Sequence, residues 1–139
     1  MKQELIDIVN RQNSLMAGRF IDKPVVPYIE KILNFAILVT YHSQGQLAGF
    51  IAYYCNDLDN KIAFLTLLCV RPEFVGKGIG QYLLNCSIED VKNKGFVSFQ
   101  LEVNKDNQPA FHLYKRAGFE VISFDKRQFL MKKNLNYEG

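Results

Sequence analysis

Three glycines alternate with other residues in a short segment that could bind an anion: Gly76, Gly78 and Gly80. An apolar stretch precedes them and an amphipathic stretch follows, which predicts a turn from a strand into a helix. Glycine permits positive φ, and the first amide groups of a helix lack internal partners and carry partial positive charge. The turn could hold a pyrophosphate, with Lys77 at its rim. The alternative is that a tight turn simply requires glycine.

The spacing of these glycines excludes two widespread phosphate-binding motifs. A Walker loop needs Ser or Thr directly after its lysine, but Gly78 follows Lys77. A dinucleotide-binding fingerprint needs G-x-G-x-x-G, whereas the glycines here follow G-x-G-x-G and Gln81 comes next. An anion site in this segment would therefore belong to another class.

A second segment with polar side chains follows a predicted strand. Asn104 lies at the strand exit, and Asn107 lies where a helix with Pro109 in its first turn begins. Asparagine is a common N-cap, so Asn107 has a structural explanation as well as a functional one. Tyr114 shares a helical face with Ala110. A phenol of pKa ~10 could donate a proton to a departing thiolate, but a core tyrosine with a bonded hydroxyl fits the pattern equally well.

The elements that must position these residues follow from periodicity and turn signals. We expect helices over residues 2–13, 28–33, 79–94 and 107–117, and strands over residues 35–41, 47–55, 62–70, 96–103, 119–122 and 128–132. Short turns join the first three strands, so they should be antiparallel. The order predicts one α/β domain over residues 1–139, with a mixed, mostly antiparallel central sheet and helices on both faces.

Composition narrows the function classes. The net charge is +3, and Lys and Arg are scattered, which argues against nucleic-acid binding. The three cysteines form no C-x-x-C pair, which is typical of a reduced, cytoplasmic compartment. No apolar stretch reaches 18 residues, so we expect no membrane span. We also expect no metal site.

Residues 70–84 and residues 101–110, which run on to 113–119, together resemble the cofactor motifs of the GCN5-related N-acetyltransferase (GNAT) superfamily. The resemblance covers roughly residues 35–133. It implies the acyl-CoA N-acyltransferase fold, acetyl-CoA as the acyl-donor cosubstrate and an amine as the acceptor. The family motif [Q/R]-x-x-G-x-[G/A] falls on residues 75–80, and Val75 stands where the family has Arg or Gln.

The resemblance also implies roles for individual residues. Backbone groups of the strand before the glycine turn would hold the pantetheine arm and the acetyl carbonyl, and an N–H near Val70 would stabilise the oxyanion. Tyr114 would protonate the leaving thiolate. The residues that the resemblance assigns to the cofactor are Leu68, Cys69, Val70, Val75, Gly76, Lys77, Gly78, Ile79, Gly80, Asn104, Asn107 and Tyr114.

The general base is less clear from the sequence. An alkyl amine of pKa ~10.4 is protonated at neutral pH, so its proton must be removed. Glu102 is the candidate we favour, while Asp57, Asp59, His112 and a water chain stay open. No carboxylate lies in the central strand over residues 62–70.

The acceptor site should involve the amino-terminal helices and the loop after Cys55. The candidate residues are Tyr28, Tyr54, Asn56 and Asp57. Tyr53 and Tyr54 should point to opposite faces of their strand, so only one of them can line a pocket.

The function predicted from these features is an acetyl-CoA-dependent N-acetyltransferase. Its acceptor would be a primary amine of a small molecule such as an amino sugar, polyamine or amino acid, attacking the thioester directly in a ternary complex. The alternatives are a protein N-terminal or lysine acetyltransferase and a non-catalytic acyl-CoA-binding or regulatory domain. A homodimer is possible.

Overall fold

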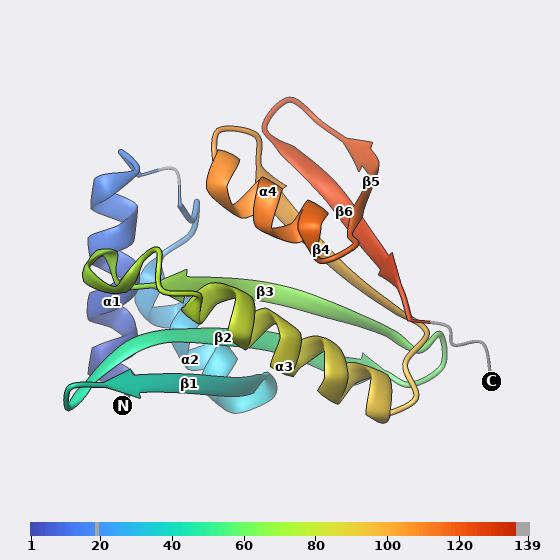
Figure 1. The fold of residues 1–139 in the computed structure, drawn as a ribbon, viewed down its shortest axis with the longest axis horizontal. Coiled ribbons are helices and arrows are strands. Elements are labelled where there is room, and N and C mark those ends of the chain that lie inside the picture. Colours follow the sequence, from blue (N-terminus) through green and yellow to red (C-terminus); the bar gives the residue numbers. More distant parts are fainter. Residues whose placement is uncertain (19, 136–139) are drawn as a thin grey trace.

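The computed structural model describes residues 1–18 and 20–135, and in them the chain forms a six-stranded sheet with helices on both faces (Figure 1). The elements in chain order are α1 (Lys2–Leu15), α2 (Val25–Phe35), β1 (Ile37–Ser43), β2 (Gln46–Asp57), β3 (Ile62–Val70), a 3-10 turn (Pro72–Phe74), α3 (Ile79–Asn93), β4 (Ser98–Asn104), α4 (Gln108–Arg116), β5 (Glu120–Phe124) and β6 (Gln128–Asn134).

The sheet order is β1-β2-β3-β4-β6-β5, and only β3 and β4 pair in parallel. The other neighbours are antiparallel. The parallel pair arises because α3 connects β3 to β4 as a crossover, whereas short turns connect the strands of the β1–β2–β3 meander. The predicted mixed, mostly antiparallel sheet is confirmed.

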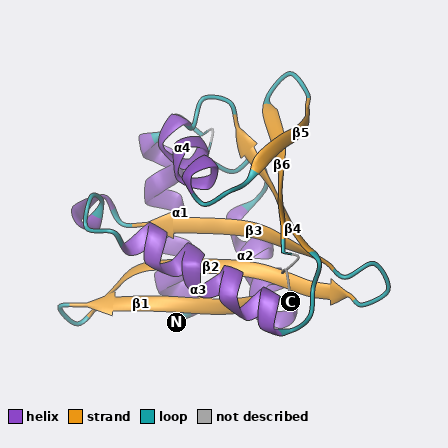
Figure 2. Cartoon of the chain, turned by 45° about the vertical axis from the view of Figure 1, so that its right-hand side comes forward, coloured by secondary structure: helices purple, strands orange, loops and turns teal. Residues whose placement is uncertain are grey.

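Two hydrophobic cores lie on opposite faces of the sheet. Under α1 and α2, residues such as Leu5, Ile29 and Ile32 pack against Phe50 and its neighbours. On the opposite face, α3 and α4 contribute the second core (Figure 2). Its largest buried side chains include Tyr53, Leu83, Leu84, Phe99 and Phe119. The predicted helices on both faces are therefore present.

The second helix is longer than the sequence indicated. It begins at Val25 and ends at Phe35, so Phe35 belongs to the helix, and the strand predicted from residue 35 starts at Ile37. Proline is tolerated in a first helical turn because the amide it lacks would have no partner there, so Pro27 does not delay the helix. The strand prediction treated Phe35 as a buried apolar residue of the strand, but Phe35 is 65% exposed at the end of α2.

A bulge in β3 determines the shape of the sheet. Ala52 pairs with Leu67 and Tyr53 pairs with Leu65, so Thr66 has no partner in the register with β2. The extra residue reverses the side-chain alternation, and Leu65 and Leu67 consequently enter opposite cores. The nearly continuous apolar run of β3 is explained by burial on both faces.

β3 and β4 separate beyond this bulge. Their parallel pairs run only from Ile62 with Ser98 to Leu65 with Leu101. The strands then diverge like the arms of a V, with β4 leading toward α4 (Figures 1 and 2). No helix in the described part of the chain is long and apolar enough to cross a membrane.

Candidate functional site

The opening between β3 and β4 contains a cavity of about 830 Å³, which we call the cleft. Its walls come from segments that are far apart in the sequence: β3, the end of β4, α4, the connection between α1 and α2, and the turn between β5 and β6. The residues that carry the chemistry considered below include Asp22, Tyr28, Thr66, Leu68, Glu102, Asn104, Asn107 and Tyr114.

The carboxyl half of β3 offers backbone groups to this opening. Thr66 to Val70 have no β4 partner in the observed register, because the last pair is Leu65 with Leu101. On the other side, β3 remains paired with β2 as far as Val70 with Gly49. Alternate amides and carbonyls of this half-strand are thus available to a ligand lying along it. The structure provides the free strand edge that the sequence resemblance implied at Leu68, Cys69 and Val70.

Cys69 can act there only through its backbone. Its side chain is buried in the core under α1, where the thiol donates to the carbonyl of Ile8 at 3.9 Å. Burial raises the pKa of the Cys69 thiol to about 12, so the thiol stays protonated at neutral pH. A covalent intermediate on this sulfur is therefore excluded by both position and protonation.

The glycine turn has the backbone conformation expected of an anion site. Gly76 has φ +86° and Gly78, the N-cap of α3, has φ +80°, and no side chain of the described residues caps the helix. The first helical bond runs from Tyr82 N–H to the Gly78 carbonyl at 3.0 Å. The amides of Ile79 and its two successors therefore precede the helical ladder and have no partner within it. A pyrophosphate fits this cradle by charge and by its need for donors.

The turn lies outside the lining of the cleft, and the 3-10 turn over Pro72–Phe74 separates it from the end of β3. A long, anionic ligand lying along the free edge of β3 would therefore place one end in the cleft and its phosphates near the turn. Val75 is 65% exposed and contributes no charge. Lys77, between Gly76 and Gly78, supplies a positive charge within the turn. It lies over the ring of Phe74, with its Nζ 5.9 Å from the ring centroid.

At Gly80, neither φ nor space requires glycine. A Cβ at this position would meet Leu113 Cδ2 at 3.5 Å and Val70 Cγ2 at 3.7 Å, which are ordinary contact distances. The first turn of α3 therefore packs closely against α4 and the end of β3. Gly76 and Gly78, in contrast, have open space and are required by their positive φ.

Tyr114 extends from α4 into the cleft and is 6% exposed. Its ring contacts Phe119, with centroids 5.9 Å apart. Burial, and to a smaller extent the nearby Tyr28, raises the pKa of the Tyr114 hydroxyl well above its usual range. The hydroxyl therefore keeps its proton at neutral pH, and it has no hydrogen-bond partner among the described residues. It is a donor available to a ligand in the cleft.

Asn104 and Asn107 both line the cleft and both stabilise the local backbone. The Asn104 side-chain oxygen accepts from the amide of Asp106 at 2.8 Å. The Asn107 oxygen accepts from the amide of Ala110 at 3.3 Å, which is the predicted N-cap of α4. Their carboxamide oxygens are thus occupied by backbone amides, and their NH₂ groups are the donors that a cofactor could use.

Among the base candidates named from sequence, only Glu102 lines the cleft. Asp57 accepts from the backbone and side chain of Asn60 at 3.0 and 3.3 Å and organises the β2–β3 turn. Asp59 and His112 are exposed and line neither cavity. The structure adds Asp22 to the cleft, which sequence analysis missed because no periodic or motif signal surrounds it.

Another cleft carboxylate, Asp125, has a structural role. It accepts from the amides of Arg127 and Gln128 at 2.8 and 2.7 Å. These backbone hydrogen bonds lower the pKa of Asp125, which therefore stays ionised and caps the β5–β6 turn. It is a poor candidate for taking up a proton.

The four predicted acceptor residues divide into two groups. Tyr28 lines the cleft, and Tyr54 lines a smaller adjoining cavity. Asn56 and Asp57 lie near the β2–β3 turn and line neither cavity. Their role in acceptor binding stays a prediction.

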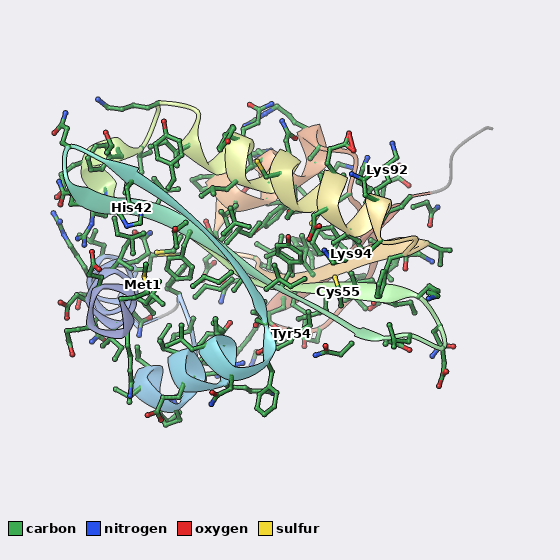
Figure 3. All side chains as sticks on the ribbon, turned by 90° about the horizontal axis from the view of Figure 1, so that it is seen from below. Met1, His42, Tyr54, Cys55, Lys92 and Lys94 are labelled. Atoms are coloured by element: carbon green, nitrogen blue, oxygen red, sulfur yellow. The ribbon has the colours of Figure 1, made fainter. Side chains whose placement is uncertain are left out.

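The adjacent tyrosines Tyr53 and Tyr54 point to opposite faces of β2. Tyr53 is buried in the α3 core and donates to Asp90 at 2.7 Å. Tyr54 lies on the α2 side, whereas Cys55 lies on the side of Lys94 and α3 (Figure 3). The pairing of one core tyrosine with one cavity tyrosine follows from the two-residue repeat of a strand.

Tyr28 connects α2 to the bulge in β3. Its hydroxyl donates to the Thr66 carbonyl at 2.7 Å and lies 2.6 Å from the Thr66 hydroxyl, which can donate in return. Burial raises the pKa of Tyr28 to about 12, so this hydroxyl also stays protonated. The described residues contain no group of His, Cys, Asp and Glu placed to hold a metal ion.

The acetyltransferase (GNAT) family profile matches residues 5–119. This chain belongs to the GNAT acetyltransferase family. It is 39% identical over 95 residues to an N-acetyltransferase of Methanocaldococcus jannaschii, a match covering 66% of this chain and 42% of that protein. It is 34% identical over 91 residues to a spermidine N(1)-acetyltransferase of Thermoplasma acidophilum, covering 66% of this chain and 55% of the relative.

A solved relative matches nearly the whole fold. The PaiA N-acetyltransferase of Thermoplasma acidophilum, in complex with coenzyme A, superposes with a TM-score of 0.79 at 26% identity, covering 96% of this chain and 92% of that one. The matched stretch is less than half the length of the first curated relatives. Acetyl-CoA is the donor cosubstrate of the family, and the free β3 edge and uncapped α3 terminus fit its pantetheine and pyrophosphate.

Proposed function

We propose that this protein transfers the acetyl group of acetyl-CoA to a primary amine of a small molecule within a ternary complex. The observation that carries the proposal is the separation of β3 from β4 after Leu65, which leaves a free strand edge beside Tyr114 in the cleft. The chain continues from that edge to the uncapped amino terminus of α3, outside the cleft. The strand edge could bind a thioester, Tyr114 could protonate the thiolate that leaves it, and the helix terminus could bind the phosphates.

The reaction needs few side chains. The amine nitrogen forms a bond to the thioester carbon, the carbon–sulfur bond breaks, the amine loses a proton and the thiolate gains one. A free amide near Val70 would donate to the oxyanion, and Tyr114 would supply the proton to sulfur. Positioning both substrates together would account for much of the acceleration, since it removes the entropy cost of their encounter.

We assign removal of the amine proton to Glu102, directly or through water. It is the carboxylate from the predicted set that lines the cleft. Asp22 lines the same cleft and offers a second carboxylate, which provides a matched control within one cavity.

Calorimetric titration with acetyl-CoA tests the donor half of the proposal. Gly78→Asp would place a negative charge at the cradle and should abolish measurable binding, because the amides there would face a carboxylate instead of the pyrophosphate. Gly95→Asp is the matched control. Gly95 also has a positive φ, of +84°, with open space around it, but it follows the opposite end of α3.

Release of free thiol with a panel of amines tests the reaction itself. Turnover that requires both acetyl-CoA and an amine would support the enzyme, and transfer only to peptide amino termini or lysines would replace the small-molecule acceptor. Binding of acetyl-CoA without turnover on any amine would favour the non-catalytic alternative. We also propose a cytoplasmic location, consistent with three free cysteines, and a possible homodimer, which sedimentation would test.

A further inference from the structure

A second cavity of about 440 Å³ adjoins the cleft and differs from it in charge. We call it the side cavity. It is lined by α2 and the segment before it together with Tyr54, Phe64 and Thr66. Lys23, Tyr28, Phe64 and Thr66 line both cavities, so a small molecule could occupy the cleft with one end and the side cavity with the other.

The charged residues described in the side-cavity lining are both cations, Lys23 and Lys31. The Lys23 Nζ lies 4.6 Å from the centroid of the Tyr28 ring, and the Lys31 Nζ lies 5.9 Å from that of Tyr54. Neither lysine forms an ion pair with a carboxylate of the described residues. Two ammonium groups therefore face a cavity without a carboxylate in its described lining, which favours an anion there.

The nearest acidic neighbours in sequence are directed elsewhere. Glu30, next to Lys31, pairs with Lys2 at 2.7 Å. Asp22, next to Lys23, lines the cleft but not the side cavity. The cleft lining thus contains carboxylates such as Asp22 and Glu102 together with cations, of which Lys23 is one, whereas the charged residues described in the side-cavity lining are cations alone. This difference suits a molecule that places an amine in the cleft and an anionic group in the side cavity.

The Tyr54 hydroxyl provides an independent observation. It is buried and has no hydrogen-bond partner among the described residues. Burial raises the pKa of Tyr54, so the group is a protonated donor. Buried polar groups in folded proteins nearly always have a partner, and an oxygen of a bound anion would provide one here. Tyr28, in contrast, already donates to Thr66.

We propose that the side cavity binds a carboxylate or phosphate of the acceptor, so that the acetylated amine belongs to an anionic molecule such as an amino acid or a phosphorylated amino sugar. Lys23 and Lys31 attract the anion, and Tyr54 donates to it. The inference rests on the acetyl transfer proposed above. It also predicts a difference from the spermidine acetyltransferase relative, because a polycation would be repelled by the two lysines.

The test compares kcat/KM within amine pairs that differ by one anionic group. Glucosamine 6-phosphate against glucosamine reports on phosphate, and tyrosine against tyramine reports on carboxylate. We expect at least one anionic member to be preferred by about tenfold, the effect of one charge-assisted hydrogen bond. Lys23→Met and Lys31→Met should each reduce that preference about fivefold, mainly through KM, and Tyr54→Phe by about threefold.

Lys61→Met is the matched control. Lys61 also lies over an aromatic ring, with its Nζ 5.7 Å from the Phe96 centroid, but it lines neither cavity. It should leave the preference unchanged. Equal rates within both pairs, or a preference that survives in the Lys23→Met/Lys31→Met double variant, would overturn the proposal while leaving acetyl transfer intact.

Binding decides the inference independently of turnover. Backbone amide resonances of Tyr54 and Thr66 in the protein bound to CoA, which has no acetyl group to transfer, should shift on titration with glucosamine 6-phosphate or tyrosine, and shift less with glucosamine or tyramine. These shifts in a protein that acetylates nothing would support the anion site and reject the proposed reaction. No selective shift with either anionic probe would reject the anion site.

Discussion

The proposed donor and acceptor sides of the site are constructed differently. The proposed donor side consists of the free half of β3, the glycine turn and Tyr114, and much of it is backbone whose conformation depends on neighbouring residues. The proposed acceptor side consists of Tyr28, the two lysines of the side cavity and Tyr54, which are side chains from separate elements. Backbone groups suit the binding of acetyl-CoA, which the whole family shares. Side chains can be substituted one at a time, so they suit the binding of acceptors that differ among members. Changes on the donor side should therefore affect all acceptors equally, and changes on the acceptor side should be selective.

The largest effect on the donor side should come from Tyr114→Phe. Loss of the proton donor should lower kcat about 100-fold for every amine, with little change in acetyl-CoA affinity, since the ring and its packing remain. Steady-state thiol release with two different amines measures this. Tyr82→Phe is a control on an exposed tyrosine of α3. A loss of kcat for only one of the two amines would mean that Tyr114 contacts the acceptor instead of protonating the thiolate.

The Tyr28 hydroxyl should make the free energy of unfolding depend on pH. Its folded pKa of about 12 lies above the value of about 10 expected when unfolded, so the folded state retains a proton that the unfolded state loses. Its contribution is complete below pH 10 and declines as pH rises to 12, by about 2 kcal/mol.

Urea unfolding at pH 9 and at pH 11.5 measures this contribution. The loss of stability between the two pH values should be smaller in Tyr28→Phe than in the unsubstituted protein. Tyr41→Phe, which changes a tyrosine outside both cavities, is the control. An equal loss in all three proteins would mean that burial does not raise the pKa of the Tyr28 hydroxyl.

Glu102→Gln should lower kcat/KM about tenfold at neutral pH, because the amide cannot accept the amine proton. The effect should diminish as pH approaches the pKa of the amine, ~10.4, where the free base predominates. Asp22→Asn tests the other carboxylate of the cleft. A larger effect of Asp22→Asn would identify Asp22 as the base. No effect of either substitution would indicate that the amine loses its proton to water.

The smallest expected effect is a gain. Val75→Arg restores the residue type that the family has at this position and should tighten acetyl-CoA binding about threefold, the size expected of one exposed charge contact. The gain should decrease at high salt, since the interaction is exposed. Val75→Met, which adds length without charge, is the control in the same titration. An equal gain from Met would indicate apolar contact rather than charge.

The donor side was largely predictable because its signals are local. Alternating glycines before an amphipathic stretch indicated the turn at Gly76 and Gly78, and Asn107 with Pro109 indicated the start of α4. The acceptor side was less predictable. Tyr28 and Tyr54 were named, but Lys23, Lys31 and Asp22 had no pattern to distinguish them from other exposed charges.

The sequence by itself determined the elements, their order and the family, because hydrophobic periodicity, caps and turns act over a few residues. It could not locate the bulge at Thr66, since an apolar strand buried on both faces has no alternation to interrupt. The tertiary structure decided where β3 leaves β4 and which side chains meet there. The hydrogen bond from Tyr28 to Thr66 joins residues 38 positions apart, and such contacts depend on how the layers pack.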